Sequence, residues 1–209
     1  MDKEILFQVN ALGKKYNGTT ALENIDMEIY KGEIVGLIGE NGAGKSTLLR
    51  IIAGVEQPTA GTMQMHQKPY ACQNPIQANK MGIGMVFQEQ SLIKNLTVSQ
   101  NIFLGRESGY KKLGFMDWQA MNRDAQAALA AIGIERIAPE KKIMSLTYSE
   151  RQMVEIAKVF NMVGGKLGGG AVILLDEPTS VLNDAEIQQL FTEVERMKSD
   201  GNAVIFVSH

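Results

Sequence analysis

Hydrophobic residues recur along the chain with two periods, and each period predicts a different kind of element. Over residues 25–29 apolar and acidic residues alternate, which predicts a strand with one buried face. A second strand is predicted over 33–38, after a turn at residues 31–32. Two later runs, 171–175 and 203–207, are apolar at every position. Such runs suit strands covered on both faces, as in a parallel sheet packed between helices.

Three further segments repeat apolar residues with the period of a helix, and polar residues mark their first turns. Asp117 and Asp184 are each placed to cap a helix, and Thr147 with Glu150 has the spacing of a capping box. Gly201 is expected to end the last helix. The faces expected to be buried carry Trp118, Met121, Ala125, Leu129 and Ile132, then Met153, Ile156, Phe160 and Val163, then Ile187, Leu190, Phe191, Val194 and Met197.

This order of elements predicts an α/β protein in which a mostly helical segment interrupts a core. The core is expected to comprise 1–88 and 166–209, and the inserted segment 89–165, within one domain of 209 residues. The last strand, helix and strand have the length of a right-handed crossover between parallel strands. A glycine-rich stretch, 164–170, is expected to be a flexible link back to the core.

Composition excludes several classes of function. The chain has 21 Lys and Arg against 23 Asp and Glu, so its net charge of -2 provides no overall basic field for nucleic acid. The single cysteine, Cys72, excludes an internal disulfide, and we expect it and His66 at the surface. No apolar run approaches the roughly 20 residues of a membrane span, and the N-terminus does not begin like a signal peptide. We therefore expect a soluble protein of the cytoplasm.

The strongest chemical signal is the phosphate-loop pattern Gly-x-x-x-x-Gly-Lys-Ser at residues 39–46. Its glycines allow backbone N–H groups to close around phosphate oxygens, and the helix predicted after it adds the positive end of its dipole. Lys45 is expected to reach the β- and γ-phosphates, and the Ser46 hydroxyl to bind Mg²⁺. The expected nucleotide contacts are Gly39, Glu40, Asn41, Gly42, Ala43, Gly44, Lys45, Ser46 and Thr47.

Two acids follow the apolar run at 171–175 and complete the expected chemistry. Asp176 is placed at the carboxyl edge of the sheet, where P-loop NTPases hold Mg²⁺ with an aspartate. Glu177 is placed to accept a proton from the water that attacks the γ-phosphate. We therefore expect an enzyme that hydrolyses a nucleoside triphosphate with Mg²⁺; the resemblance described next implies that this nucleotide is ATP.

With these motifs in this order, the chain closely resembles the nucleotide-binding domain of ABC transporters. The resemblance implies a P-loop NTPase (RecA-like) core, a mostly helical ABC subdomain and an N-terminal antiparallel β portion. It also implies that Tyr16 stacks on adenine and that Gln88 contacts the metal and links the core to the helical subdomain. By the same resemblance His209 contacts the γ-phosphate, and Ser180 lies in the loop that crosses to a partner domain.

The family's signature, normally Leu-Ser-Gly-Gly-Gln, is degenerate here. At its position stand Leu146, Thr147, Tyr148, Ser149 and Glu150. In this family the signature of one domain closes over ATP held by the other, so Tyr148 adds bulk and Glu150 adds negative charge near a polyanion. Asn183 likewise replaces the usual aspartate of the crossing loop. The resemblance thus implies a competent ATP site that offers a poor signature to its partner.

The pattern looks most like the first ATP-binding half of bacterial monosaccharide importers, for a sugar such as ribose, galactose or xylose. That likeness implies a second ABC cassette, transmembrane permease subunits and, indirectly, a solute-binding protein as partners, with the chain on the cytoplasmic face of the inner membrane. An importer of nucleosides or of a furanosyl signalling molecule is an alternative. A soluble ABC ATPase acting on ribosomes or DNA and a regulatory ATP-binding module are further alternatives. Since the family continues beyond the strand that ends near His209, we expect a piece of a longer, tandem protein.

Overall fold

The computed structural model describes residues 4–40, 42–87, 90–112, 114–163 and 169–207. The chain divides into two compact units. The first comprises Met1–Val86, Met162–Glu177 and Val194–His209, and the second comprises Phe87–Asn161 and Pro178–Glu193. Asn41, Gln88, His209 and most of the expected glycine link lie outside the described residues.

An antiparallel sheet in the first unit contains β1 (Ile5–Tyr16), β2 (Thr19–Tyr30), β4 (Ala60–Met65) and β5 (Lys68–Tyr70), in the order β2-β1-β4-β5. Asn17 and Gly18 join its two long strands, with φ of 43° and 90°. Two successive residues with positive φ form the tight turn that matches the twist of a hairpin. The alternation over residues 25–29 lies in β2, as predicted.

The second sheet of this unit is parallel and contains β3 (Ile34–Leu37), β10 (Ala203–Val207), β9 (Val172–Asp176) and β6 (Ile83–Val86), in the order β3-β10-β9-β6. Every residue of β9 and all but one of β10 are buried, which confirms the prediction from the two apolar runs. Burial on both faces favours such uninterrupted hydrophobic strands. The expected α/β core with an antiparallel N-terminal portion is confirmed.

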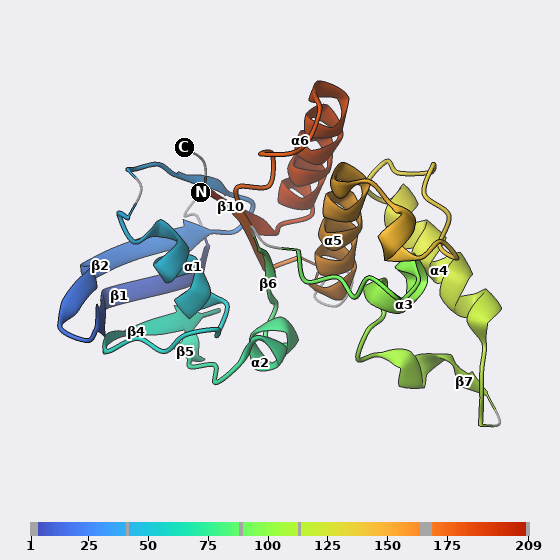
Figure 1. Cartoon of the computed structure of the whole chain (residues 1–209). Helices are drawn as coiled ribbons and strands as arrows, with labels where there is room; N and C mark the ends of the chain where they lie inside the picture. The colour runs from blue at the N-terminus through green and yellow to red at the C-terminus, as the bar shows by residue number, and fades with distance from the viewer. Residues whose placement is uncertain (1–3, 41, 88–89, 113, 164–168, 208–209) are drawn as a thin grey trace. The chain divides into compact units, whose positions relative to one another are not determined.

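Two helices of the described residues lie wholly in the first unit, α1 (Lys45–Ile52) and α2 (Pro75–Lys80). Helix α1 contacts both β2 and β9, so it lies between the two sheets (Figure 1). Its apolar stripe of Leu48, Leu49, Ile51 and Ile52 is buried. The helix that follows the phosphate loop is therefore held firmly in the core.

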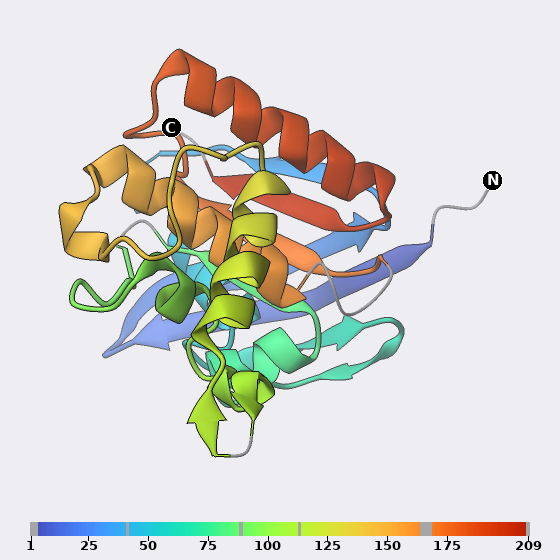
Figure 2. The same ribbon diagram turned by 90° about the vertical axis from the view of Figure 1, so that its right-hand side faces the viewer.

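The second unit is mostly helical. Its elements are α3 (Val98–Ile102), the 3-10 helix η1 (Glu107–Tyr110), the short hairpin β7 (Lys111–Lys112) and β8 (Phe115–Met116), α4 (Trp118–Ala130), the 3-10 helix η2 (Ile143–Ser145), α5 (Tyr148–Val163) and the first part of α6 (Asp184–Ser199). Helix α3 packs beside α4, as Figures 1 and 2 show.

Three caps on two helices, α4 and α6, test the predicted boundaries. Asp117 caps α4 by accepting a 2.9 Å bond from the Ala120 N–H, as predicted. Gly201 ends α6 as predicted, because its N–H bonds to Lys198 and the next N–H bonds to Met197, the pattern of a Schellman motif. The prediction that Asp184 caps α6 is wrong. Asn183 is the cap, since its Oδ1 accepts a 3.0 Å bond from the Glu186 N–H.

Three side chains differ from their predicted exposure. Phe191 and Trp118 lie on helices but are 47% and 48% exposed, so neither belongs to a buried stripe. Each lies beside the apolar stripe of its helix, and the narrower stripe is sufficient to cover the core. Cys72, expected at the surface, is buried, with its Sγ 3.5 Å from the Met81 Sδ. A free cysteine behaves as a small hydrophobic residue, which accounts for this position.

Among the described residues, no helix combines the length and the apolar composition that a membrane crossing requires.

Candidate functional site

The phosphate-loop residues join the end of β3 to the start of α1 in the first unit. Gly44 is the N-terminal cap of α1 with φ of 86°, and in the described part of the loop no side chain bonds to the first N–H groups of the helix. Uncapped N–H groups and the helix dipole together favour an anion at this position. The geometry therefore suits binding of a phosphate group.

Lys45, the first residue of α1, folds back over the loop. Its Nζ donates to the carbonyl oxygens of Gly39 at 2.5 Å and Glu40 at 3.0 Å. These contacts hold the ammonium group above the loop, so a phosphate oxygen bound there would lie beside a fixed positive charge. An ammonium group so placed is a strong partner for a polyphosphate.

Ser46 and Asp176 meet although 130 residues separate them in the sequence. The Ser46 Oγ donates to the Asp176 Oδ1 at 3.4 Å, and Asp176 is 3% exposed at the end of β9. Two ligands at adjacent positions of an Mg²⁺ ion lie about 3 Å apart, given metal–oxygen distances of about 2.1 Å. A hydroxyl and a carboxylate are also the hard oxygen ligands that Mg²⁺ prefers. The pair therefore fits Mg²⁺.

Glu177 follows Asp176 directly and has a strained backbone. Its φ is 49°, in the left-handed region that few residues other than glycine adopt, and its N–H donates to the Val207 carbonyl at 3.2 Å. Such strain costs about 1–3 kcal/mol and occurs often at functional sites. Glu177 is half-buried and lies one residue from Asp176, the candidate metal ligand.

Gly44 also brings the antiparallel sheet close to the phosphate loop. A Cβ at this position would lie 2.6 Å from the Ala21 carbonyl oxygen and 2.7 Å from the Leu22 Cδ2. The neighbouring Gly42 has a similar φ of 84°, but a Cβ there would meet nothing within 4 Å. Only a residue without a side chain allows β2 to approach the start of α1 this closely.

We expect Gly44→Ala to lower the free energy of unfolding by at least about 2 kcal/mol, because left-handed strain of about 1–2 kcal/mol adds to a clash with backbone. Thermal or urea unfolding measures this loss. Gly42→Ala is the matched control, since it adds the same strain without the clash. Equal destabilisation by both variants would show that the contact with β2 does not matter.

Tyr16 lies at the end of β1 and is held from two sides. Its phenol donates to the Glu56 carboxylate, and the Lys14 Nζ lies over its ring, 4.9 Å from the centroid. Glu56 also pairs with Lys14 at 3.6 Å and with Arg50 of α1 at 3.8 Å. Partial burial and the bond to Glu56 raise the pKa of the Tyr16 phenol above its usual value. The ring is therefore fixed, with a cation on one face.

The signature-like residues 146–150 form the start of α5 in the second unit. Leu146 is buried, and Tyr148 is 51% exposed. The predicted capping box is present: the Glu150 carboxylate accepts from the Thr147 N–H at 2.8 Å, and the Thr147 Oγ1 accepts from the Glu150 N–H at 3.2 Å. The Glu150 carboxylate thus folds back onto its own helix terminus.

Two acids that bind predicted site residues were not themselves predicted from the sequence: Glu56, which binds Tyr16, and Glu186, which binds Ser149. Glu56 has no local signal, because its partners come from β1 and α1. Glu186 follows Asn183 by three residues, the spacing of a capping box, so this pattern was available. Of the residues expected to contact ATP or a partner, Ser180 is exposed, and Thr47 is half-buried on α1.

Comparison with known protein families and with individual proteins gives the same assignment. The family model described as "ABC transporter" matches residues 22–180. The chain is 38% identical over 204 residues to the "Ribose import ATP-binding protein RbsA 1" of Rubrobacter xylanophilus, covering 98% of this chain and 39% of that protein. It is 37% identical to a "Putative ribose/galactose/methyl galactoside import ATP-binding protein" of Pseudomonas fluorescens, covering 98% of this chain and 38% of that protein. The chain therefore spans about two fifths of the length of these relatives.

Solved structures with the same fold include a nucleotide-free ATP-binding cassette from an ABC transporter, with a TM-score of 0.81 and 22% identity, covering 98% of this chain and 81% of that chain. Another is cbiO1 from Clostridium perfringens, described as part of the ABC transporter complex cbiONQ. Its TM-score is 0.75 at 28% identity, over 99% of this chain and 79% of that chain.

Proposed function

The chain belongs to the ABC transporter family, and from that premise we propose that it binds ATP and hydrolyses it to drive a bacterial importer of a monosaccharide. The observation that carries the proposal is the pairing of Ser46 with Asp176 beside Glu177 in one unit. The sugar is proposed from the relatives, whose printed names specify import of ribose, galactose or methyl galactoside.

Nucleotide binding is assigned to the phosphate loop and to Tyr16. The N–H groups at the start of α1 bind phosphate oxygens, and Lys45 moves from the loop carbonyls to the β- and γ-phosphates. Adenine stacks on the face of Tyr16 opposite Lys14. Ser46 and Asp176 would hold Mg²⁺, which when bound neutralises charge on the phosphates.

Hydrolysis is assigned to Glu177 and two residues outside the described part of the chain. Glu177 accepts a proton from the attacking water as the oxygen of that water bonds to the γ-phosphorus and ADP leaves. Gln88 and His209 are proposed to contact the metal and the γ-phosphate, as the family resemblance implies. Lys45 stabilises the charge that spreads over the γ-phosphate oxygens.

A second cassette, permease subunits and, indirectly, a solute-binding protein are the proposed partners, at the cytoplasmic face of the inner membrane. The segment 146–150 and the loop 180–183 are proposed to face the second cassette. Tyr148 and Glu150 make this segment a poor ligand for ATP on that partner, because one is bulky and the other is negatively charged.

The proposal is tested with the full native protein assembled with its permease in vesicles. We expect ATP hydrolysis that requires Mg²⁺ and rises when a binding protein loaded with ribose or galactose is added. Loading with a nucleoside is the comparison. Hydrolysis stimulated only by the nucleoside would replace the sugar assignment, and ATP hydrolysis without coupling to any solute would remove the transport function.

Glu56→Ala is expected to weaken ATP binding about fivefold, because one hydrogen bond worth about 1 kcal/mol no longer fixes the Tyr16 ring. Titration with a fluorescent ATP analogue measures the change. Glu28→Ala is the matched control, since Glu28 accepts a 2.6 Å bond from Tyr30 at the other end of β2. If both variants bind ATP like the unaltered protein, the Tyr16–Glu56 pair has no part in adenine binding.

A further inference from the structure

Glu186 is a buried acid that the proposed chemistry does not use. It lies in the first turn of α6 and is 3% exposed. One carboxylate oxygen accepts from the Arg136 guanidinium, and the other accepts from the Ser149 hydroxyl and, at 3.2 Å, from the Asn183 N–H. All four residues belong to the second unit.

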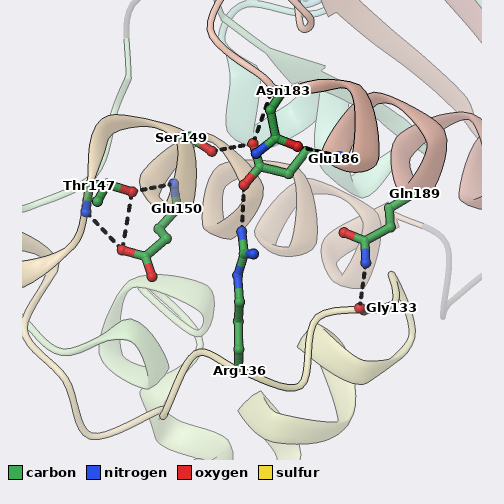
Figure 3. A network of polar contacts seen from close by, with 8 residues as sticks. All are labelled: Gly133, Arg136, Thr147, Ser149, Glu150, Asn183, Glu186 and Gln189. Carbon is green, nitrogen blue, oxygen red and sulfur yellow. Dashed lines mark hydrogen bonds and ion pairs between the residues drawn. The ribbon is translucent and has the colours of Figure 1, made fainter.

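This carboxylate connects the beginnings of two helices (Figure 3). Asn183 and Glu186 form a reciprocal capping box at α6, since the Asn183 Oδ1 also accepts from the Glu186 N–H at 3.0 Å. Ser149 lies in the first turn of α5, between the Thr147 and Glu150 residues of the other capping box. The bond from Ser149 to Glu186 therefore joins one capped terminus to the other.

The charge of Glu186 is stabilised where it lies. Burial by itself would raise the pKa of Glu186, but the bonds from Ser149 and the Asn183 N–H and the charge of Arg136 outweigh burial and lower that pKa. A buried carboxylate with several donors is strongly disturbed when one of them is removed. The ionised form therefore depends on groups from three separate segments of the chain.

We infer that Glu186 is a positioning residue for the surface that faces the second cassette. It holds the signature-like segment 146–150 and the crossing loop 180–183 in one fixed arrangement, with Arg136 as the counter-charge. This inference rests on the proposed function, in which both segments contact the partner. The Ser149 hydroxyl is engaged by Glu186, whereas the neighbouring Tyr148 is 51% exposed and available to the partner.

A residue that only capped α6 would need fewer contacts than Glu186 makes. Capping of α6 requires only the contacts between Asn183 and Glu186, and it leaves α5 unaffected when lost. If Glu186 links the two helix termini, disturbing its carboxylate must alter segment 146–150 and loop 180–183 together. The distinction lies in the response of α5, to which Glu186 is tied by the single hydroxyl of Ser149.

Amide hydrogen exchange on the full native protein separates the two roles. In Glu186→Gln we expect amides of residues 147–151 and 182–187 to exchange at least about tenfold faster together, since bonds to a charged group are lost in both segments. Gln189→Ala is the matched control: it removes a 3.3 Å bond from the next turn of α6 to the Gly133 carbonyl and should change neither segment. Faster exchange confined to 182–187, or unchanged exchange in both, overturns the inference.

Arg136→Met is the second variant, because the Arg136 side chain is largely exposed and its replacement removes little packing. It leaves the acid in place without its counter-charge, and we expect the same two segments to respond, more weakly. Faster amide exchange limited to the neighbourhood of residue 136 would contradict a link between the two helix termini.

Catalysis with the partner cassette supplies the functional readout. We expect Glu186→Gln to lower kcat about tenfold or more without changing ATP affinity at its own phosphate loop, which lies in the other unit. Ser149→Ala combined with Glu186→Gln should be no slower than Glu186→Gln alone, because the hydroxyl acts through the carboxylate. If the double variant instead lost kcat by the product of the two single losses, the inference would be overturned. If the unaltered assembly does not hydrolyse ATP, the proposed function fails, and the exchange result still decides the role of Glu186.

Discussion

Glu177→Gln is expected to reduce the rate of ATP hydrolysis by roughly 10²- to 10⁴-fold, the usual loss when a general base is removed. ATP affinity should stay the same, because the amide keeps the size of the side chain and the phosphate loop is unaltered. Single-turnover hydrolysis of radiolabelled ATP by the assembled protein measures the rate, and equilibrium titration measures the affinity. With a second cassette present, the variant should remain in the ATP-bound, closed pair.

The strained backbone of Glu177 supports this expectation. A φ of 49° would suit glycine, yet the chain places an acid there, directly after a buried metal-ligand candidate. The expected functional cost of losing the carboxylate is therefore far larger than any effect on folding. Glu33→Gln is a suitable control, since its carboxylate accepts a 2.9 Å bond from the Tyr30 N–H before β3 begins. Normal turnover in Glu177→Gln would exclude Glu177 as the base.

Lys45→Ala is expected to weaken ATP binding by at least about 100-fold. Hydrogen bonds to a charged group contribute about 1.5–3 kcal/mol each, and the ammonium can reach two phosphates. Titration of the protein with a fluorescent ATP analogue gives the dissociation constant. Stability should fall little, because the Lys45 Nζ bonds only to the carbonyls of Gly39 and Glu40 in the described structure.

Lys31→Ala removes the same charge from an exposed position, where Lys31 lies 3.6 Å from Glu4, and serves as the control for net charge. If the two lysine variants bind ATP equally well, the loop holds the nucleotide without an ammonium group. That result would leave the helix dipole and the backbone N–H groups as its main source of affinity.

The contiguous signals in the sequence predicted the architecture well. The apolar runs that form β9 and β10, the Thr147–Glu150 capping box and Gly201 at the end of α6 each depend on a few neighbouring residues. The wrong prediction for the cap of α6 also came from such a local signal. The position of Asp184 before the apolar stripe predicts it as the cap of α6, whereas the reciprocal bonds of Asn183 and Glu186 decide where that helix begins.

By itself, then, the sequence determined strands β2, β3, β9 and β10, helices α1, α4, α5 and α6, the phosphate loop and the acids at the carboxyl end of β9, because local periodicity and short motifs encode these features. Only the tertiary structure decided which distant side chains meet. The pairing of Ser46 with Asp176 follows from the place of β9 relative to α1, and those of Tyr16 with Glu56 and Ser149 with Glu186 follow from packing within each unit. Such contacts depend on sheet order and helix packing, which no short stretch of sequence specifies.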